Sequence, residues 1–475
     1  MTNPAVVRPR SPEWGVPPSF GQSAGAILFF GFATSAVMWV LWFLLHHPAV
    51  GATPSISGPL LIAAQIVGSV VAARSLAASH GRWTALVGSK LSGLLTGLIN
   101  LASLSSMLVA PAGGTDASRP STAVMIGGYV ALSVVIGGLA GWLAPRVSRP
   151  GVGSAPTPAD WLARLARVVV VLLVPLLLVG GLVTSTGSGL AVPDWPGTFG
   201  GNMFLYPISA MASCDKVYVE HGHRLFGVLV GLGTMALAGY TLAVEGRVWV
   251  RLWAVLIFVL VCGQGVLGGV RVVQESQYGA LVHGVLAQVI FAMLVALACS
   301  TSGAYRSETG GAEAGDRGRK ALATALLHTT LLQLVFGAMY RHLGSPHALY
   351  SHIAVALVVL LLGVLAGGRF ASRPNPGRTA AGFVAVGSGR AVLVVVSLQF
   401  VLGLAALMAA PPSSFKAPPK ADEIRAMAEA GAEAPPAWKP LVRTAHQANG
   451  ALLLAVATTM VVFGRRLSAS PARAV

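Results

Sequence analysis

The feature that most constrains this chain is a series of long apolar runs separated by short polar loops. Each run is close to the ~20 residues that a helix needs to cross the hydrocarbon core of a bilayer. Helices satisfy their own backbone polar groups in lipid, whereas a membrane β-barrel would show shorter segments of alternating hydrophobicity. We therefore expect an all-α integral membrane protein with about 12 transmembrane helices. The expected spans are residues 22–46, 55–76, 84–111, 122–145, 164–186, 221–243, 249–270, 281–300, 320–340, 350–368, 389–410 and 446–464.

The distribution of charge supports the same topology. The chain has a net charge of +17 although only 10% of its residues are charged, against roughly 25% in soluble domains. With the N-terminus in the cytoplasm, the cytoplasmic segments carry 22 Lys and Arg against 6 Asp and Glu, and the opposite side carries 10 against 9. Nearly all of the net positive charge then lies on the cytoplasmic side, as the positive-inside rule requires. The excess charge indicates orientation in the lipid bilayer and argues against a nucleic-acid partner.

The start of the chain is polar and contains several prolines, without the charged start, short apolar core and small-residue site of a cleavable signal. We expect a multi-pass protein of the cell (inner) membrane with a cytoplasmic N-terminus. The three cysteines, Cys214, Cys262 and Cys299, form no CxxC or CxxCH motif. The sequence therefore indicates neither a zinc site nor covalent haem attachment.

A stretch rich in Pro, Gly, Ser and Arg at 145–160 has the composition of a linker. It predicts three parts: a four-helix membrane block of unknown function at 1–145, a cytoplasmic linker at 146–163 and an eight-helix domain at 164–475. The first block has little ionisable chemistry at membrane depth. Its histidines, interpreted as interfacial or solvated side chains, are His46, His47 and His80.

The eight later spans repeat a pattern of glutamine, glycine and histidine. In each copy the glutamine comes four residues before the glycine, in a span that rises to the outer face. The histidine lies near the start of the descending span, 19 residues after the glutamine in two copies and after the longer loop 411–445 in the third. The charged, Ala-rich part of that loop fits either a short amphipathic helix or a solvated insert. The copies are Gln264–Gly268–His283, Gln333–Gly337–His352 and Gln399–Gly403–His446.

Four histidines should lie at one depth, at the outer ends of the descending spans: His223, His283, His352 and His446. Ionisable residues inside a membrane usually face the interior of a bundle and suggest function. Two facing imidazoles in a four-helix bundle can ligate one haem iron. Each histidine alone fits a polar interfacial residue, but four at equivalent repeat positions favour metal ligation. We expect two pseudo-symmetric bundles, one with His223 and His283, the other with His352 and His446.

Four other histidines lack equivalent positions in the repeat or lie on the opposite side, and we interpret them as non-ligands. They are His221, His328, His342 and His347.

Glu220 precedes His223 by three residues in the segment EHGHR. On a helix these two positions share a face, so the carboxylate would point into the same cavity as the imidazole. It could take a proton or stabilise positive charge during an oxidation. The alternative is an acid that only stabilises the start of its helix through the macrodipole.

Residues 164–466 resemble the haem A synthase family of cytochrome oxidase assembly proteins. The resemblance rests on the TGSGL and PDWP segments, the Glu-x-x-His-Arg start of the following span, the QxxxG repeats and the four histidines. It implies eight helices in two pseudo-symmetric halves and oxidation of a methyl group of haem O to the formyl group of haem A. It also implies that Glu220, His223 and His283 serve the substrate haem O, and that His352 and His446 ligate haem b.

The resemblance makes haem O a partner molecule and a haem O synthase or a second copy of the chain candidate partners, and it leaves the electron acceptor open. Three features depart from the family pattern. Thr184 stands near the place of an arginine that often precedes TGSG, and Cys214 stands without the cysteine pair of many bacterial members. The four N-terminal spans lie outside the pattern and suggest an added partner or regulatory role.

Two other functions remain compatible with the sequence. A di-haem b-type membrane electron carrier would hold two equivalent, non-exchanging haems. A membrane transporter or assembly factor without haem-modifying activity would use the repeats for alternating access and carry no haem.

Overall fold

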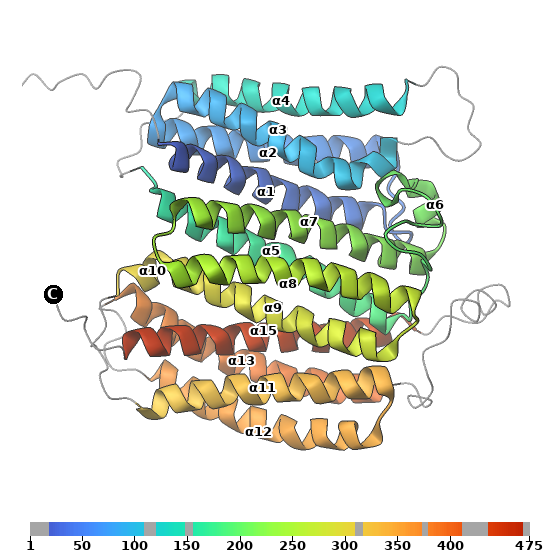
Figure 1. Cartoon of the computed structure of the whole chain (residues 1–475), viewed down its shortest axis with the longest axis vertical. Helices are drawn as coiled ribbons and strands as arrows, with labels where there is room; N and C mark the ends of the chain where they lie inside the picture. Colours follow the sequence, from blue (N-terminus) through green and yellow to red (C-terminus); the bar gives the residue numbers. More distant parts are fainter. Residues whose placement is uncertain are drawn as a thin grey trace, which may run out of the picture. The chain divides into compact units, whose positions relative to one another are not determined.

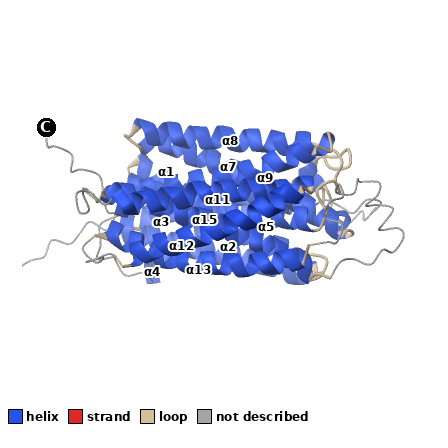
Figure 2. Ribbon diagram, turned by 90° about the horizontal axis from the view of Figure 1, so that it is seen from below, coloured by secondary structure: helices blue, strands red, loops and turns tan. Residues whose placement is uncertain are grey.

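The computed structural model describes residues 19–108, 120–147, 155–308, 317–372, 379–410 and 436–468. The described residues contain 12 helices long and apolar enough to cross a membrane, which confirms the predicted all-α, multi-pass fold. No β-strand occurs among them, as the blue helices of Figure 2 show, and a single antiparallel bridge joins Thr198 to Gly201. The charged segment predicted within 411–445 lies outside the described residues.

The long helices are α1 (Phe20–Leu45), α2 (Pro54–His80), α3 (Arg82–Leu108), α4 (Thr122–Val147), α5 (Pro158–Ser185), α7 (Asp215–Val244), α8 (Val248–Val273), α9 (Gln277–Thr301), α11 (Arg317–Leu343), α12 (Pro346–Ala371), α13 (Ala380–Met408) and α15 (Trp438–Leu467). Short helical turns are η1 (Met203–Leu205), α6 (Ile208–Ala212) and α10 (Gly303–Arg306). Helix α7 begins at Asp215, six residues before the predicted span, so the whole EHGHR segment is helical.

The chain divides into two compact units. Unit 1 contains α1 to α4, and unit 2 contains α5 from Leu162 onward and every later helix. Within unit 1, α3 and α4 approach each other closely because glycines face the backbone of the other helix. An added Cβ at Gly137 would lie 2.4 Å from the Ser89 carbonyl oxygen, and one at Gly93 would lie 2.5 Å from that of Ser133. Small residues at such positions let membrane helices pack backbone to backbone.

Unit 1 also buries a polar network around Asn100. The Trp39 indole N–H donates to Asn100 Oδ1 at 3.0 Å, and Asn100 Nδ2 donates to the Tyr129 hydroxyl at 3.2 Å. The Tyr129 hydroxyl donates in turn to Gln65 Oε1 at 3.4 Å. Buried polar groups require such partners where no water is available, and the network ties three helices to α3.

Unit 2 consists of two four-helix bundles (Figure 1). In the second bundle, α11, α12, α13 and α15 form a closed ring in which each helix contacts the next. In the first bundle, α8 packs between α7 and α9, and α5 joins through a contact of Gly180 with His223. Helix α9 contacts both α11 and α15, so the two bundles lie side by side.

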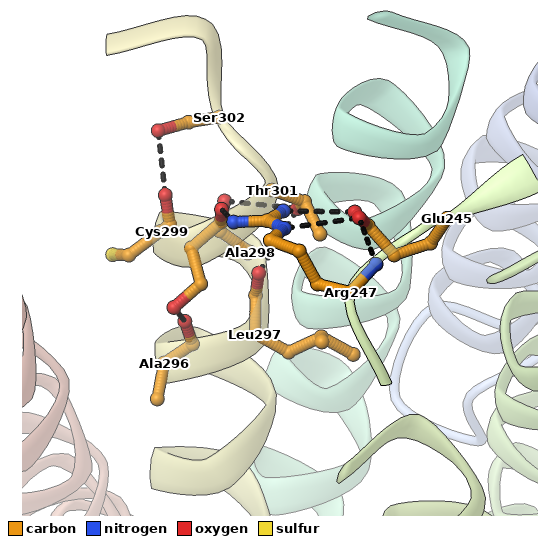
Figure 3. Close-up of polar contacts among 9 residues, drawn as sticks. Glu245, Arg247, Ala296, Leu297, Ala298, Cys299, Thr301 and Ser302 are labelled. Atoms are coloured by element: carbon orange, nitrogen blue, oxygen red, sulfur yellow. Dashed lines mark hydrogen bonds and ion pairs between the residues drawn. The ribbon is translucent and has the colours of Figure 1, made fainter. Parts of the chain in front are cut away.

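One end of unit 2 is fastened by Arg247, between α7 and α8. Figure 3 shows this arginine between Glu245 and the last turn of α9. Its Nη2 lies 2.8 Å from Glu245 Oε2, and its Nη1 donates to the Ser300 carbonyl at 3.0 Å. Hydrogen bonds from the Arg247 side chain hold the pKa of the Glu245 carboxyl below its ordinary value.

We predict that Gly137→Ala destabilises the full chain by about 1–3 kcal/mol, because the new methyl group overpacks the α3–α4 contact. Gly128→Ala, on the same helix, should be neutral or slightly stabilising, because an added Cβ there meets no atom within 4 Å and alanine is the better helix former. Thermal unfolding of both variants in detergent micelles measures the difference. Equal midpoints for the two variants would contradict the close packing described here.

Candidate functional site

The four histidines singled out by the sequence all lie near the ends at which α7, α9, α12 and α15 begin. These helix ends lie together on the right-hand side of Figure 1, and we call this the histidine end of unit 2. His223 and His283 face each other in the first bundle, with ring centroids 6.4 Å apart and ring planes at 77°. His352 and His446 face each other in the second bundle, at 6.2 Å and 79°. The structure thus brings together both pairs.

The spacing within each pair fits one iron between two imidazoles. With a metal–nitrogen bond of about 2 Å on each side and about 1 Å from each nitrogen to its ring centre, the centroids of two coaxial ligands lie roughly 6 Å apart. Among the described residues, no group of three or more His, Cys, Asp and Glu side chains could hold a metal ion. A pair of imidazoles suits haem iron, whose remaining ligands are the porphyrin nitrogens.

Each histidine packs against a glycine on the preceding long helix. An added Cβ on that glycine would lie closer to the imidazole carbon Cε1 than ordinary van der Waals contact allows. The distances to Cε1 are 2.8 Å for Gly180 and His223, 2.9 Å for Gly268 and His283, 2.8 Å for Gly337 and His352, and 3.2 Å for Gly403 and His446. The glycines therefore create the space in which the imidazole rings sit.

The contact of Gly180 with His223 adds a fourth copy of the repeat that the sequence analysis missed. Leu176 stands four residues before this glycine, where the other copies have glutamine. The outer loop between α5 and α7 also lengthens the separation from glycine to histidine. A search for glycine and histidine alone at the ends of consecutive spans would have found it.

The repeat glutamines orient the histidines. Gln264 Nε2 donates to the carbonyl of His283 at 2.6 Å, and Gln333 Nε2 donates to that of His352 at 2.8 Å. The Nδ1 atom of His352 lies 3.0 Å from the Gln333 carbonyl oxygen. A proton on Nδ1 donated to this carbonyl leaves Nε2 free to accept a proton or bind a metal.

In the third copy, the glutamine contacts the histidine ring directly. Gln399 Nε2 lies 3.2 Å from Nδ1 of His446 itself, and Asn449 donates to Gln399 Oε1 at 2.8 Å. The amide therefore fixes the ring of His446 from its Nδ1 side.

Glu220 lies 2% exposed in the second turn of α7, and its carboxylate binds the outer loop. Its Oε2 accepts the backbone N–H of Val192 at 3.0 Å, and its Oε1 accepts Arg224 Nη2 at 2.9 Å. It also interacts electrostatically with Arg271 of α8, which interacts in turn with His283. The carboxylate is thus held in the wall of the first bundle by the loop and by two arginines.

Arg224 fastens the loop 186–201 over the start of α7. Besides Glu220, its guanidinium donates to three carbonyl oxygens of the loop. These are Asp194 O at 2.7 Å, Val192 O at 2.7 Å and Gly197 O at 3.2 Å. The loop follows α5, and this motif attaches it to the start of α7, at the histidine end of the first bundle.

The loop has its own internal support. The Asp194 carboxylate accepts the backbone N–H groups of Phe199 and Gly200, each at 2.8 Å. Burial alone would raise the pKa of Asp194, but these hydrogen bonds and the charge of Arg224 outweigh it and lower the pKa. The Trp195 ring packs on Gly269 of α8, where an added Cβ would lie 2.2 Å from the indole.

The other histidines occupy different surroundings. The ring of His221 is buried and lies 3.1 Å from the Thr198 hydroxyl, and His328 is exposed. His342 lies 3.7 Å from the Cβ position of Gly284 on α9. His80, expected at an interface or in solvent, is instead 7% exposed and contacts the Ser79 hydroxyl through Nδ1 at 2.7 Å.

Two arginines of the histidine end were not predicted from the sequence. Arg271 follows the repeat glycine Gly268 by three residues, and Arg341 follows Gly337 by four. An arginine at the end of an apolar span is often a simple interfacial anchor, so composition did not distinguish them. Their position behind the repeat glycine was the available signal.

Residues 163–350 match the family model COX15-CtaA, described as cytochrome oxidase assembly protein. The matched segment is therefore similar to proteins of this family. The match extends from the start of α5 into the first turn of α12, and it contains Glu220, His223 and His283. The family's description supports a role of the matched segment in cytochrome oxidase assembly. No curated protein and no solved structure matches the chain.

We predict that Arg224→Gln frees the loop 186–201, because the loop carbonyls lose their shared donor and Glu220 loses its ion pair. Amide hydrogen exchange of the loop should accelerate at least tenfold, as the loss of about 1.4 kcal/mol of local stability implies. Lys216→Gln, in the first turn of the same helix, is the charge-matched control and should leave the exchange unchanged. Unaltered exchange in Arg224→Gln would show that the loop is held by other contacts.

Proposed function

We propose that this protein is a haem A synthase-like membrane oxidoreductase that converts a methyl group of haem O to the formyl group of haem A. The observation that carries the proposal is the presence of two facing histidine pairs, 6.4 and 6.2 Å between centroids, beside a covered carboxylate. We place the protein in the cell inner membrane with a cytoplasmic N-terminus. The four helices of unit 1 would serve a partner or a regulatory role.

The two bundles would bind different haems. His223 and His283 would hold the iron of the substrate haem O, under the loop 186–201. His352 and His446 would hold haem b, which supplies one-electron redox chemistry when bound. The glycine contacts and the glutamine hydrogen bonds fix the rings before any haem arrives, so little conformational entropy is lost on binding.

Glu220 is our candidate for the acid–base group of the first bundle. Conversion of a methyl group to a formyl group with oxygen from water removes four electrons and four protons. The electrons would pass through the second bundle to an external acceptor, and a positioned carboxylate can accept a proton. The hydrogen bonds from Val192 and Arg224 orient this carboxylate. The loop that supplies Val192 also keeps bulk water from the site, which strengthens electrostatic interactions within it.

A di-haem electron carrier is the second candidate, because the two histidine pairs have nearly the same geometry. The surroundings of the pairs favour the enzyme instead. A buried carboxylate and a fastened loop accompany the first pair, whereas the described residues around the second pair include no acidic side chain in an ion pair. Two equivalent, non-exchanging haems in the purified protein would favour the carrier, and a protein without haem would favour a transporter.

We predict that His352→Ala and His446→Ala each remove the spectrum of a tightly bound low-spin haem, because one axial ligand is lost. His328→Ala is the control. This exposed histidine lies in the half of α11 that is farther from the histidine end, and it contacts the Thr324 carbonyl. Absorption spectra of the reduced purified proteins provide the measurement. A normal low-spin spectrum in both ligand variants would refute the assignment to the second bundle.

We predict that Glu220→Gln lowers haem A output by ~10²–10⁴-fold, the range for a positioned acid–base group. Haems B, O and A are extracted and separated by chromatography from membranes that also contain a haem O source. Arg224→Gln is the matched variant, because it disturbs the same loop and leaves the carboxylate in place. If both variants lose output equally, Glu220 only positions the loop. If wild-type membranes make no haem A, the proposed reaction is wrong.

A further inference from the structure

Arg341, near the end of α11, is a partly buried cation at the seam between the two bundles. Its Nη1 donates to Gln447 Oε1 at 2.8 Å, and its Nη2 donates to Ser185 Oγ at 2.5 Å and to the Gly181 carbonyl at 3.2 Å. All three acceptors are neutral. The Nε atom is buried without a hydrogen-bond partner.

A second arginine lies close to the first. Arg443 is on α15, three residues before His446, and it interacts electrostatically with Arg341. Arg341 interacts with His446 in the same way. Positions three apart share a helix face, so Arg443 lies on the side of α15 that carries the histidine.

Neither arginine has an acidic partner in the part of the chain that the structure describes. The ion pairs found there join Arg224 to Glu220 and Arg247 to Glu245. Two like charges in a membrane interior repel each other and lose hydration. Such a pair is stable when an anion lies between the two cations, and arginine binds carboxylates through paired N–H groups.

The first bundle differs in this respect. Its arginines, Arg224 and Arg271, both interact with Glu220, and Arg224 also interacts with the Asp194 carboxylate of the loop. Two carboxylates of the protein thus accompany these two arginines, and an anionic ligand would compete with them.

We infer that Arg341 and Arg443 form a carboxylate-binding site for the propionates of the haem held by His352 and His446. The inference rests on the proposed function, because it requires haem in the second bundle. The same difference in charge balance makes the second bundle retain its haem, while the first bundle, whose arginines already have carboxylates, releases its haem more readily. A resident redox haem and an exchangeable substrate haem need this asymmetry.

The test compares ferric protohaem with its dimethyl ester, in which both propionates are uncharged. The probe is the full chain in micelles, freed of haem and carrying His223→Ala so that the second bundle is the measured site. We expect protohaem to bind about 10- to 100-fold more tightly than the ester, as charge-assisted hydrogen bonds imply. Arg341→Gln and Arg443→Gln should each reduce this preference, and the low-spin spectrum should persist at saturating haem.

Three further variants make the outcome decisive. Arg341→Lys keeps the charge and should keep part of the preference. Arg247→Gln is the control, because this arginine is paired with Glu245 (Figure 3) and follows the end of α7, the helix that begins at the histidine end; its loss should leave the preference unchanged. Arg271→Gln should also leave it unchanged. An equal preference for protohaem over the ester in wild type, Arg341→Gln and Arg443→Gln would overturn this inference and leave the proposed function standing. A wild-type chain that binds neither haem form with a low-spin spectrum would overturn the proposed function with it.

Discussion

The contact between an imidazole ring and a bare glycine backbone is the interaction on which the rest of unit 2 depends. In each of the four helix pairs the glycine lets the following helix approach until the histidine ring lies against its neighbour. Membrane helices gain little from apolar burial against each other, so close packing and interhelical hydrogen bonds decide their arrangement. The repeat glycines allow the close packing, and the repeat glutamines supply the hydrogen bonds. Together these contacts fix the imidazole rings.

The second constraint is the free-energy cost of burying charged groups in a low-dielectric interior. At the histidine end of the first bundle, Glu220 is balanced by Arg224 and lies near Arg271, and the loop carbonyls take the remaining donors of Arg224. In the second bundle, Arg341 has only neutral acceptors. Two bundles built on one repeat thus differ mainly in their charged residues. Under the proposed function, this difference, rather than the histidine geometry, would make one haem a substrate and the other a cofactor.

The candidate site was predictable where it depended on spacing along the chain. Three copies of the repeat and the pairing of His352 with His446 followed from the order of the spans, because α12 and α15 run in the same direction within one bundle and both begin at the histidine end. The copy with Leu176 was missed, since its glutamine is replaced and its loop is long. The i, i+3 relation placed Glu220 on the face of His223 but gave no information about Val192, whose N–H reaches the carboxylate from a loop 28 residues earlier.

The sequence by itself determined the 12 spans and the depth of the histidines, because hydrophobic length and the position within a span are local properties of the chain. Only the tertiary structure decided which charged groups have partners. Arg341 meets Ser185 and Gln447, which are 156 and 106 residues away in the chain. No local pattern encodes such contacts, because they arise from the packing of α5, α11 and α15 at one end of the molecule. The electrostatics of the two sites follow from that packing.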